Sequence, residues 1–260
     1  MKKFASRFPF LFALAVTAAA MLCLIWPMLW FKGWSITVQV VLSRVTICIF
    51  AVVMLVSLGW WRQVGFRKID GRRTLLPYLP LFILVVLLGT LELITIGVHV
   101  ADLGTLLIGL AVYLSGGFME EAVFRGLVLH PLKPGGLLRA AVISSLIFGV
   151  VHFINLIGGA NLNATVLQVV TAALVGFSFV APLAVTGNIW PLVVIHFITN
   201  FATFLTAGGF LNTAETSQTP GLVEALVSLV PTLLMAAISW WILTRAQKKE
   251  LVTSQSVAAD

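Results

Sequence analysis

Apolar residues in this 260-residue chain fall into eight long runs separated by short polar or charged connections. Each run is about 20 residues long, the length that an α-helix needs to cross the hydrocarbon core of a bilayer. We therefore predict an all-α, polytopic transmembrane helical bundle of about eight spans. The predicted spans are residues 9–31, 36–58, 76–98, 104–130, 137–157, 163–185, 188–207 and 222–244.

Composition supports a membrane as the solvent of this chain. Hydrophobic residues make up 60% of the sequence, charged residues only 10%, and the mean hydropathy is +1.09. Soluble domains are about one quarter charged, so an ordinary soluble protein is excluded. The first apolar run is longer than the core of a typical secretory signal and no small-x-small cleavage pattern closes it, so we interpret it as a retained span.

The distribution of charge predicts the orientation. The formal net charge of +7 comes from 16 Lys and Arg residues, of which 13 fall in the terminal segments and alternate connections that an eight-span chain places on one side. Cytoplasmic connections are enriched in Lys and Arg, so we expect both termini to be cytoplasmic and the basic residues to face membrane lipid rather than nucleic acid. We expect one membrane domain, 1–245, with a motif core at about 104–207, followed by a loose cytoplasmic tail at 246–260.

Several ionisable residues fall within the predicted spans. Glu120, Glu121 and Arg125 lie in the fourth span, His152 in the fifth and His196 in the seventh. Each such group costs about 2.5–3.5 kcal/mol on membrane-insertion scales. Lipid does not solvate them, so we expect them to face one another or a wet cavity.

Helical geometry divides the acidic pair. Glu121 and Arg125 are four residues apart, about 40° in projection, and are expected to pair along one helix face. Glu120 points about 140° away from Arg125 and is left for a partner on another helix. Glycines at 116, 117 and 126 allow a neighbouring backbone to approach this segment closely.

The same spacing rule places other polar groups together. His152 follows Phe148 by four residues, and His196 precedes Asn200 by four, so each pair shares a helix face. Taken singly, each of these residues has an ordinary structural role, and for Arg44 and Glu92 we favour a structural or snorkelling role. Taken together, an unpaired glutamate, two histidines and an asparagine in three spans favour a single polar site.

Three motifs resemble those of the CPBP family, the CAAX prenyl proteases and bacteriocin-processing or immunity membrane proteins also called the Abi family. They are Glu-Glu-Ala-Val-Phe-Arg-Gly at 120–126, Phe-Gly-Val-Val-His at 148–152 and His-Phe-Ile-Thr-Asn at 196–200, and Gly-Asn-Ile-Trp-Pro at 187–191 looks like the family's approach to its last motif helix. The resemblance covers about residues 115–205 and implies an intramembrane endopeptidase with a helical core.

The resemblance also implies roles for individual residues. Glu120 and His152 would activate a water, His196 and Asn200 would stabilise the oxyanion, and Glu121, Arg125 and Phe148 would support the site. No metal site is firm; if the enzyme depends on zinc, Glu120, His152 and His196 are the expected ligands. We favour activation by Glu120 without a metal and keep zinc as the alternative cofactor.

Other functions stay open at this stage. The expected substrate is a peptide or a membrane protein, including CAAX-like ones, and the short loops favour a prokaryotic cytoplasmic membrane. The main alternative is a non-proteolytic bacteriocin-immunity or membrane scaffold protein with the same fold. A proton-coupled carrier also uses buried acids and histidines, but carriers usually have matched halves with broken helices, and the sequence has no such symmetry.

Overall fold

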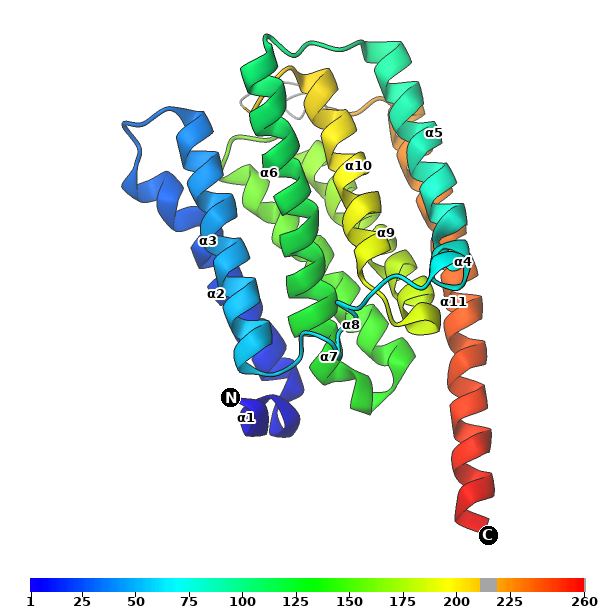
Figure 1. The fold of residues 1–260 in the computed structure, drawn as a ribbon. Coiled ribbons are helices and arrows are strands. Elements are labelled where there is room, and N and C mark those ends of the chain that lie inside the picture. Colours follow the sequence, from blue (N-terminus) through cyan, green and yellow to red (C-terminus); the bar gives the residue numbers. More distant parts are fainter. Residues whose placement is uncertain (211–218, 260) are drawn as a thin grey trace.

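The computed structural model describes residues 1–210 and 219–259, with side chains up to residue 247. Within those ranges every regular element is a helix, and eight segments are long and apolar enough to cross a membrane (Figure 1). The predicted all-α transmembrane bundle is therefore confirmed, and the chain is an integral membrane protein. The eight segments are Pro9–Trp30, Ile36–Ser57, Gly71–Ile96, Leu103–Gly135, Leu137–Leu156, Leu162–Thr186, Trp190–Ala207 and Leu222–Gln247.

Five of these segments lie within single helices and the other three are composite. A short α1 (Lys2–Arg7) precedes the first, which is α2, and the others that lie within single helices are α3 (Ile36–Ser57), α9 (Leu162–Thr186), α10 (Trp190–Ala207) and the eighth. The third combines α4 (Gly71–Leu75), η1 (Leu76–Tyr78) and α5 (Leu79–Ile96), and the fifth combines α8 (Leu137–Val150) and η4 (Val151–Leu156). The fourth contains α6 (Leu103–Glu121), η2 (Ala122–Val128), α7 (Leu129–Leu132) and η3 (Lys133–Gly135), and the eighth belongs to α11 (Leu222–Ala259).

Local sequence explains where several helices begin and end. Asp102 accepts a hydrogen bond of 2.9 Å from the Thr105 amide at the start of α6, and Asn161 caps α9 in the same way. Gly187 adopts a left-handed conformation (φ +62°) that ends α9, a conformation in which glycine carries no Cβ penalty. The break expected near 187 is therefore present, and it separates α9 from α10.

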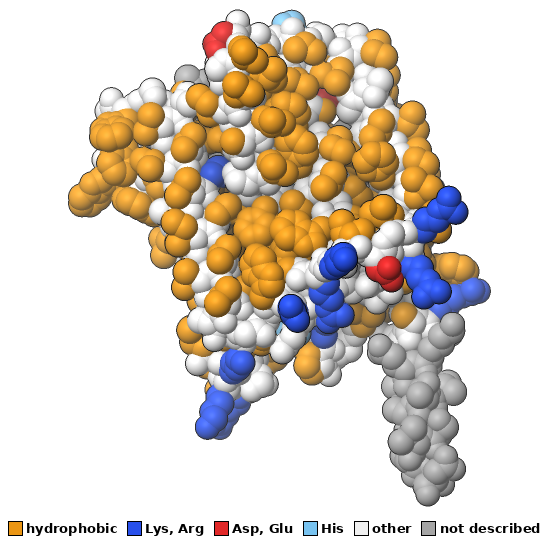
Figure 2. Space-filling model, in the orientation of Figure 1, with side chains coloured by type: hydrophobic (Ala, Val, Ile, Leu, Met, Phe, Trp, Pro, Cys, Tyr) orange, Lys and Arg blue, Asp and Glu red, His pale blue; other side chains and the backbone are white. Residues whose placement is uncertain are grey.

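The outer faces of the bundle are apolar. Large hydrophobic side chains point outward along the spans, including Leu22, Ile49, Leu87 and Leu234 (Figure 2). Many hydroxyl groups in the spans bond back to their own helix, as Thr17 does with the carbonyl of Ala13 at 2.8 Å. Lipid supplies no hydrogen bonds, so this arrangement suits a bilayer.

Both chain termini lie at the same end of the bundle (Figure 1). Segments at that end also contact one another: the Asn188 side chain donates to the carbonyls of Arg67 and Lys68, and the Leu138 amide at the start of α8 donates to Gln247 of α11. Most of the described Lys and Arg side chains visible in Figure 2 gather at this end. The predicted even number of spans is confirmed, while the assignment of this end to the cytoplasm stays a prediction.

Several expected boundaries differ from the structure. The third span begins at Gly71 rather than 76, the fourth continues to Gly135 rather than 130, and α11 stays helical to Ala259 where a loose tail was expected. A helix satisfies its own backbone hydrogen bonds in water as well as in lipid, so it continues past the apolar run that defines a span. The connection at 211–218, within the predicted seventh break, lies outside the described residues.

Candidate active site

The fourth and seventh spans touch through their backbones next to the acidic pair. A Cβ atom on Gly117 of α6 would lie 2.7 Å from the carbonyl oxygen of Val193 and 3.0 Å from the amide nitrogen of Phe197, both on α10. No side chain larger than hydrogen fits this gap. The glycine therefore brings α10 against α6 one turn before the glutamates, as the sequence predicted for this region.

Glu120, His196, Glu121 and Arg125 form a continuous row of contacts. His196 Nε2 lies 3.1 Å from Glu120 Oε2, and its Nδ1 lies 2.8 Å from Glu121 Oε1. The other oxygen of Glu121 lies 3.2 Å from Arg125 Nε, as an ion pair without the alignment of a hydrogen bond. The expected Glu121–Arg125 pair is thus present, and the expected histidine partner of Glu120 is His196.

His196 joins two carboxylates that the sequence had assigned to separate partners. A neutral imidazole carries one N–H, whereas both ring nitrogens of His196 face a carboxylate oxygen. The arrangement therefore holds a second proton, either on the ring or on one of the carboxyl groups. With His196 doubly protonated, its charge and that of Arg125 balance the charges of Glu120 and Glu121.

Accessibility separates the two glutamates. The Glu120 side chain is 14% exposed, whereas that of Glu121 is 0% exposed and that of Arg125 is 1% exposed. Only a group that is open to its surroundings can meet a water or a substrate. Glu120 is accordingly the reactive candidate of the pair, and Glu121 is a buried ion-pair partner.

The backbone changes its winding immediately after the acidic pair. α6 ends at Glu121, and Ala122–Val128 is π-helical, with all seven residues buried. Such wide turns are rare and occur frequently at functional sites. Regular α-helical winding was expected through this segment, so the π-helical turns differ from the prediction. Glu121 and Arg125 still meet across the start of the segment.

Aromatic rings enclose the buried guanidinium of Arg125. Its Cζ lies 4.8 Å from the centre of the Phe148 ring and 5.1 Å from that of Phe179, while Nη2 donates to the carbonyl oxygen of Gly176 at 3.4 Å. A cation held against aromatic faces away from water gains about 2 kcal/mol or more. The expected role of Phe148, support of the site, stays a prediction; the structure shows its ring packed against Arg125.

Phe148 also links the two histidines. Its ring centre lies 5.1 Å from that of His152 and 5.8 Å from that of His196, edge to face in both pairs. His152 lies on η4 and its Nδ1 is 2.8 Å from the Phe148 carbonyl oxygen, which orients the ring and leaves Nε2 as its other polar atom. The partly buried His152 is therefore in the same aromatic cluster as His196, but the structure gives no direct contact between it and Glu120.

Asn200 lies one turn after His196 on α10 and is partly buried. Its side chain makes no hydrogen bond with another described residue. The predicted residues in direct contact are thus Glu120, Glu121, Arg125 and His196. Phe148 packs on three predicted residues, Arg125, His152 and His196. Asn200 is near this cluster only because it lies on the same helix as His196.

Two residues of the candidate site were not predictable from the sequence. Phe179 and Gly176 belong to α9, a span without an ionisable residue. Phe179 contacts Arg125 and lies edge to face with His196 at 5.9 Å between ring centres. A phenylalanine and a glycine are ordinary residues in a membrane helix, so only the three-dimensional arrangement identifies them.

The donor groups do not fit a metal site as they are arranged. Among the described residues no set of three His, Cys, Asp or Glu side chains is placed to hold a metal ion. Both nitrogens of His196 engage carboxylates, and a nitrogen that binds zinc must offer a lone pair instead. The zinc set of Glu120, His152 and His196 therefore requires a rearrangement of His196.

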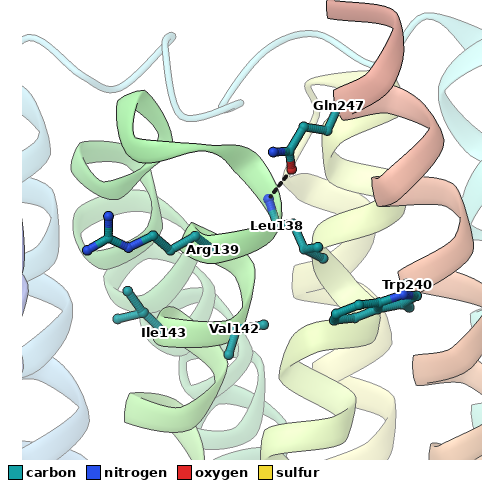
Figure 3. Close-up of a pocket in the computed structure, with 6 residues that line it drawn as sticks. All are labelled: Leu138, Arg139, Val142, Ile143, Trp240 and Gln247. Atoms are coloured by element: carbon teal, nitrogen blue, oxygen red, sulfur yellow. Dashed lines mark hydrogen bonds between the residues drawn. The ribbon is translucent and has the colours of Figure 1, made fainter. Parts of the chain in front are cut away.

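A separate cavity of about 350 Å³ lies between α8 and α11 (Figure 3). Its lining is mostly apolar and contains no acid and no histidine. Gln247 accepts a hydrogen bond of 3.4 Å from the Leu138 amide at one side of it. The lining residues are Leu138, Arg139, Val142, Ile143, Trp240 and Gln247. It offers no group for acid–base chemistry, so the candidate active site is the glutamate–histidine cluster.

Residues 102–202 match the family model described as "Type II CAAX prenyl endopeptidase Rce1-like". This match covers all three motifs, and the resemblance to the CPBP family is confirmed over the segment that contains them. No curated protein and no solved structure matches the chain.

Proposed function

We propose that this chain, with its Rce1-like segment at residues 102–202, is an intramembrane endopeptidase that hydrolyses a peptide bond with a water activated by Glu120. The observation that carries the proposal is the partly exposed Glu120 carboxylate, 3.1 Å from His196 and next to the fully buried Glu121. Glu120 is available for chemistry, and Glu121 holds the histidine that faces Glu120.

The proposed reaction begins with proton transfer from water to Glu120 as the water oxygen attacks the scissile carbonyl carbon. The carbonyl oxygen then carries a negative charge. It accepts hydrogen bonds from Asn200 and from the Nε2–H of His196, which becomes available when the facing Glu120 carboxylate takes up the proton from water. When the tetrahedral intermediate collapses, the C–N bond breaks and the proton held by Glu120 passes to the leaving amine. His152 assists Glu120 in positioning the water.

The buried residues preorganise these groups. Glu121 holds one ring nitrogen of His196 at 2.8 Å and is itself paired with Arg125. Phe148 and Phe179 enclose Arg125 and pack edge to face on His196. Since small misplacements of catalytic groups cost large factors in rate, we assign Glu121, Arg125 and Phe148 to positioning rather than to direct chemistry.

We propose that activation by Glu120 proceeds without a metal ion, because both nitrogens of His196 are engaged by carboxylates. Treatment of the purified protein with a strong chelator tests this choice. We expect cleavage to persist. Loss of cleavage that added zinc restores would replace this mechanism with a metal-dependent one.

The substrate is proposed to be a membrane-associated peptide or membrane protein of the cytoplasmic membrane of a prokaryote, including CAAX-like C-terminal sequences. Comparison of membrane proteomes tests the function and finds the substrate together. Cells that express wild-type protein should contain shortened forms of one or a few proteins. Those forms should be missing with Glu120→Ala at an equal protein level.

A non-proteolytic scaffold or immunity role makes the opposite prediction for the same comparison. In that case the proteomes of cells with wild-type protein and with Glu120→Ala would be identical, and any cellular phenotype would persist in the variant.

A further inference from the structure

The cavity between α8 and α11 plays no part in the proposed mechanism. α8 meets α9 at Gly149, where a Cβ atom would lie 2.6 Å from the carbonyl oxygen of Val169. α11 meets α9 through Ser239, which donates to the carbonyl of Ser178 at 3.1 Å. Both helices thus pack on α9 and leave a cavity of about 350 Å³ between them. This volume lies within the range of about 300–1,000 Å³ that is common for small-molecule sites.

The lining of the cavity changes from polar to apolar along the helices (Figure 3). Arg139 lies in the first turn of α8, and Gln247 is the last residue of the eighth membrane segment. Trp240 lies seven residues before Gln247, about 10 Å deeper in the span, and packs against Phe177 of α9 at 6.2 Å between ring centres. The remaining lining residues are Leu138, Val142 and Ile143. The cavity therefore has the polarity of an amphiphile, with a polar end at the boundary of the span and an apolar end inside it.

Two hydrogen-bond donors lie beside the same turn at the polar end. A Cβ atom on Gly135 would lie 3.8 Å from Arg139 Nη1, and one on Gly136 would lie 3.6 Å from Gln247 Nε2. Gln247 Oε1 accepts from the Leu138 amide at 3.4 Å, which leaves the NH2 group of Gln247 as a donor. The two glycines carry no side chain that would cover these groups. Because no acid is among the lining residues, the polar end of the cavity is positively charged.

We propose that this cavity binds an anionic glycerophospholipid, with its phosphate at Arg139 and Gln247 and one acyl chain along Trp240. Apolar side chains cover the outer faces of the spans, and Lys and Arg side chains gather at this end of the bundle (Figure 2). Basic pockets between spans bind anionic lipid headgroups, and tryptophan is enriched at the level of the membrane interface. A guanidinium also makes strong hydrogen bonds to phosphate.

The shape of the lining favours a lipid over a soluble phosphate compound, because a soluble anion would leave the apolar part at Val142, Ile143 and Trp240 unfilled. An anionic lipid is favoured over phosphatidylcholine, because choline would bring a second cation next to Arg139. The proposal does not depend on the protease function, since the cavity contains none of the proposed catalytic residues.

Native mass spectrometry of the purified full-length protein tests the proposal. The protein is titrated with phosphatidylglycerol or with phosphatidylcholine that has the same acyl chains. Wild type should bind one phosphatidylglycerol at least about 5-fold more tightly than phosphatidylcholine, the factor that one basic residue contributes near an anionic lipid. Arg139→Gln should lose this preference, and Arg139→Lys, which keeps the charge, should retain part of it. Equal binding of the two lipids by wild type, or an unchanged preference in Arg139→Gln, would overturn the proposal.

Arg73→Gln is the matched control, because Arg73 is also an exposed arginine but lies on α4, outside the lining of the cavity. It should keep the full preference for phosphatidylglycerol. An equal loss in Arg73→Gln and Arg139→Gln would mean that the basic surface as a whole attracts the lipid, and would contradict a site at the cavity. In detergent without added lipid, Arg139→Gln should unfold as wild type does, because the side chain is exposed.

The apolar part of the site is tested by filling it. Val142→Trp places a large ring in the cavity and should weaken phosphatidylglycerol binding, whereas Leu146→Trp, at an exposed position of α8 outside the lining, should not. Equal binding by these two variants would contradict the placement of the acyl chain. An excess of inorganic phosphate should leave the bound lipid in place. Displacement of the lipid by phosphate would indicate a simple anion site and would contradict the lipid assignment.

Discussion

Removal of Arg125 should destabilise the protein through the charge that it leaves behind. Glu121 is 0% exposed and has Arg125 as the permanent cation in contact with it, at 3.2 Å. Deleting one partner of a buried ion pair costs about 3–5 kcal/mol. The contacts of the guanidinium with Phe148 and Phe179 are lost at the same time. We therefore expect Arg125→Ala to lower the free energy of unfolding by at least about 3 kcal/mol.

Reversible unfolding in mixed detergent micelles, followed by tryptophan fluorescence, measures this change. Combining Arg125→Ala with Glu121→Gln removes the carboxylate charge that has lost its arginine partner and keeps a polar group next to His196. The double variant should recover about 2 kcal/mol of the loss, the scale of a hydrogen bond to a charged group. Arg139→Ala, at an exposed position, should change stability by less than about 0.5 kcal/mol.

A loss below about 1 kcal/mol for Arg125→Ala, or a double variant that is no more stable than the single one, would refute the reasoning. Either result would mean that water or another cation neutralises Glu121, and that the row of contacts from Arg125 to His196 does not hold the site together.

Three other expectations concern single positions. Gly117→Ala places a methyl group 2.7 Å from the Val193 carbonyl oxygen, so it should lower the free energy of unfolding by about 1–3 kcal/mol in the same assay. Gly116→Ala, with 3.7 Å to its nearest neighbour, should be tolerated. Equal effects of the two substitutions would contradict the close approach of α6 and α10. Asn188→Ala removes two hydrogen bonds of 3.2 Å to the carbonyls of Arg67 and Lys68, and we expect faster proteolysis of the connection that contains these two residues. An unchanged rate of proteolysis would argue against a stabilising role for these hydrogen bonds. Hydrogen bonds at the start of α6 lower the pKa of Asp102 from 3.8. Its ionised form therefore stabilises the fold above pH 3.8, and this stabilisation is lost as the pH falls through the lowered pKa. The stability difference between wild type and Asp102→Asn, measured from about pH 7 to pH 3, should shrink at the acid end and not grow.

The spans were predictable because each depends on a property of a single segment. Length and hydropathy alone place the eight spans, and the turn residues near Gly187 mark the break between α9 and α10. The boundaries at 71 and 135 differ from prediction because helical winding does not stop where hydropathy falls. The hydrogen bonds of a helix are internal and do not depend on the solvent around it.

The site was predictable only in part because its contacts join different helices. Spacing along one helix correctly paired Glu121 with Arg125 and left Glu120 for a histidine. The same rule cannot say that one imidazole serves both acids, since that depends on the rotation of α10 against α6. Phe179 and the π-helical turn at 122–128 also depend on packing between spans, and no residue type or spacing identifies them.

The rate of peptide cleavage by Glu120→Gln tests the central claim most directly. Glutamine keeps the size of the side chain and its contact with His196 but cannot accept a proton from water. With protein that elutes and unfolds as wild type does, kcat/KM for one defined peptide should fall by at least about 100-fold. Cleavage by Glu120→Gln within a few-fold of the wild-type rate would contradict the assignment of Glu120 as the base.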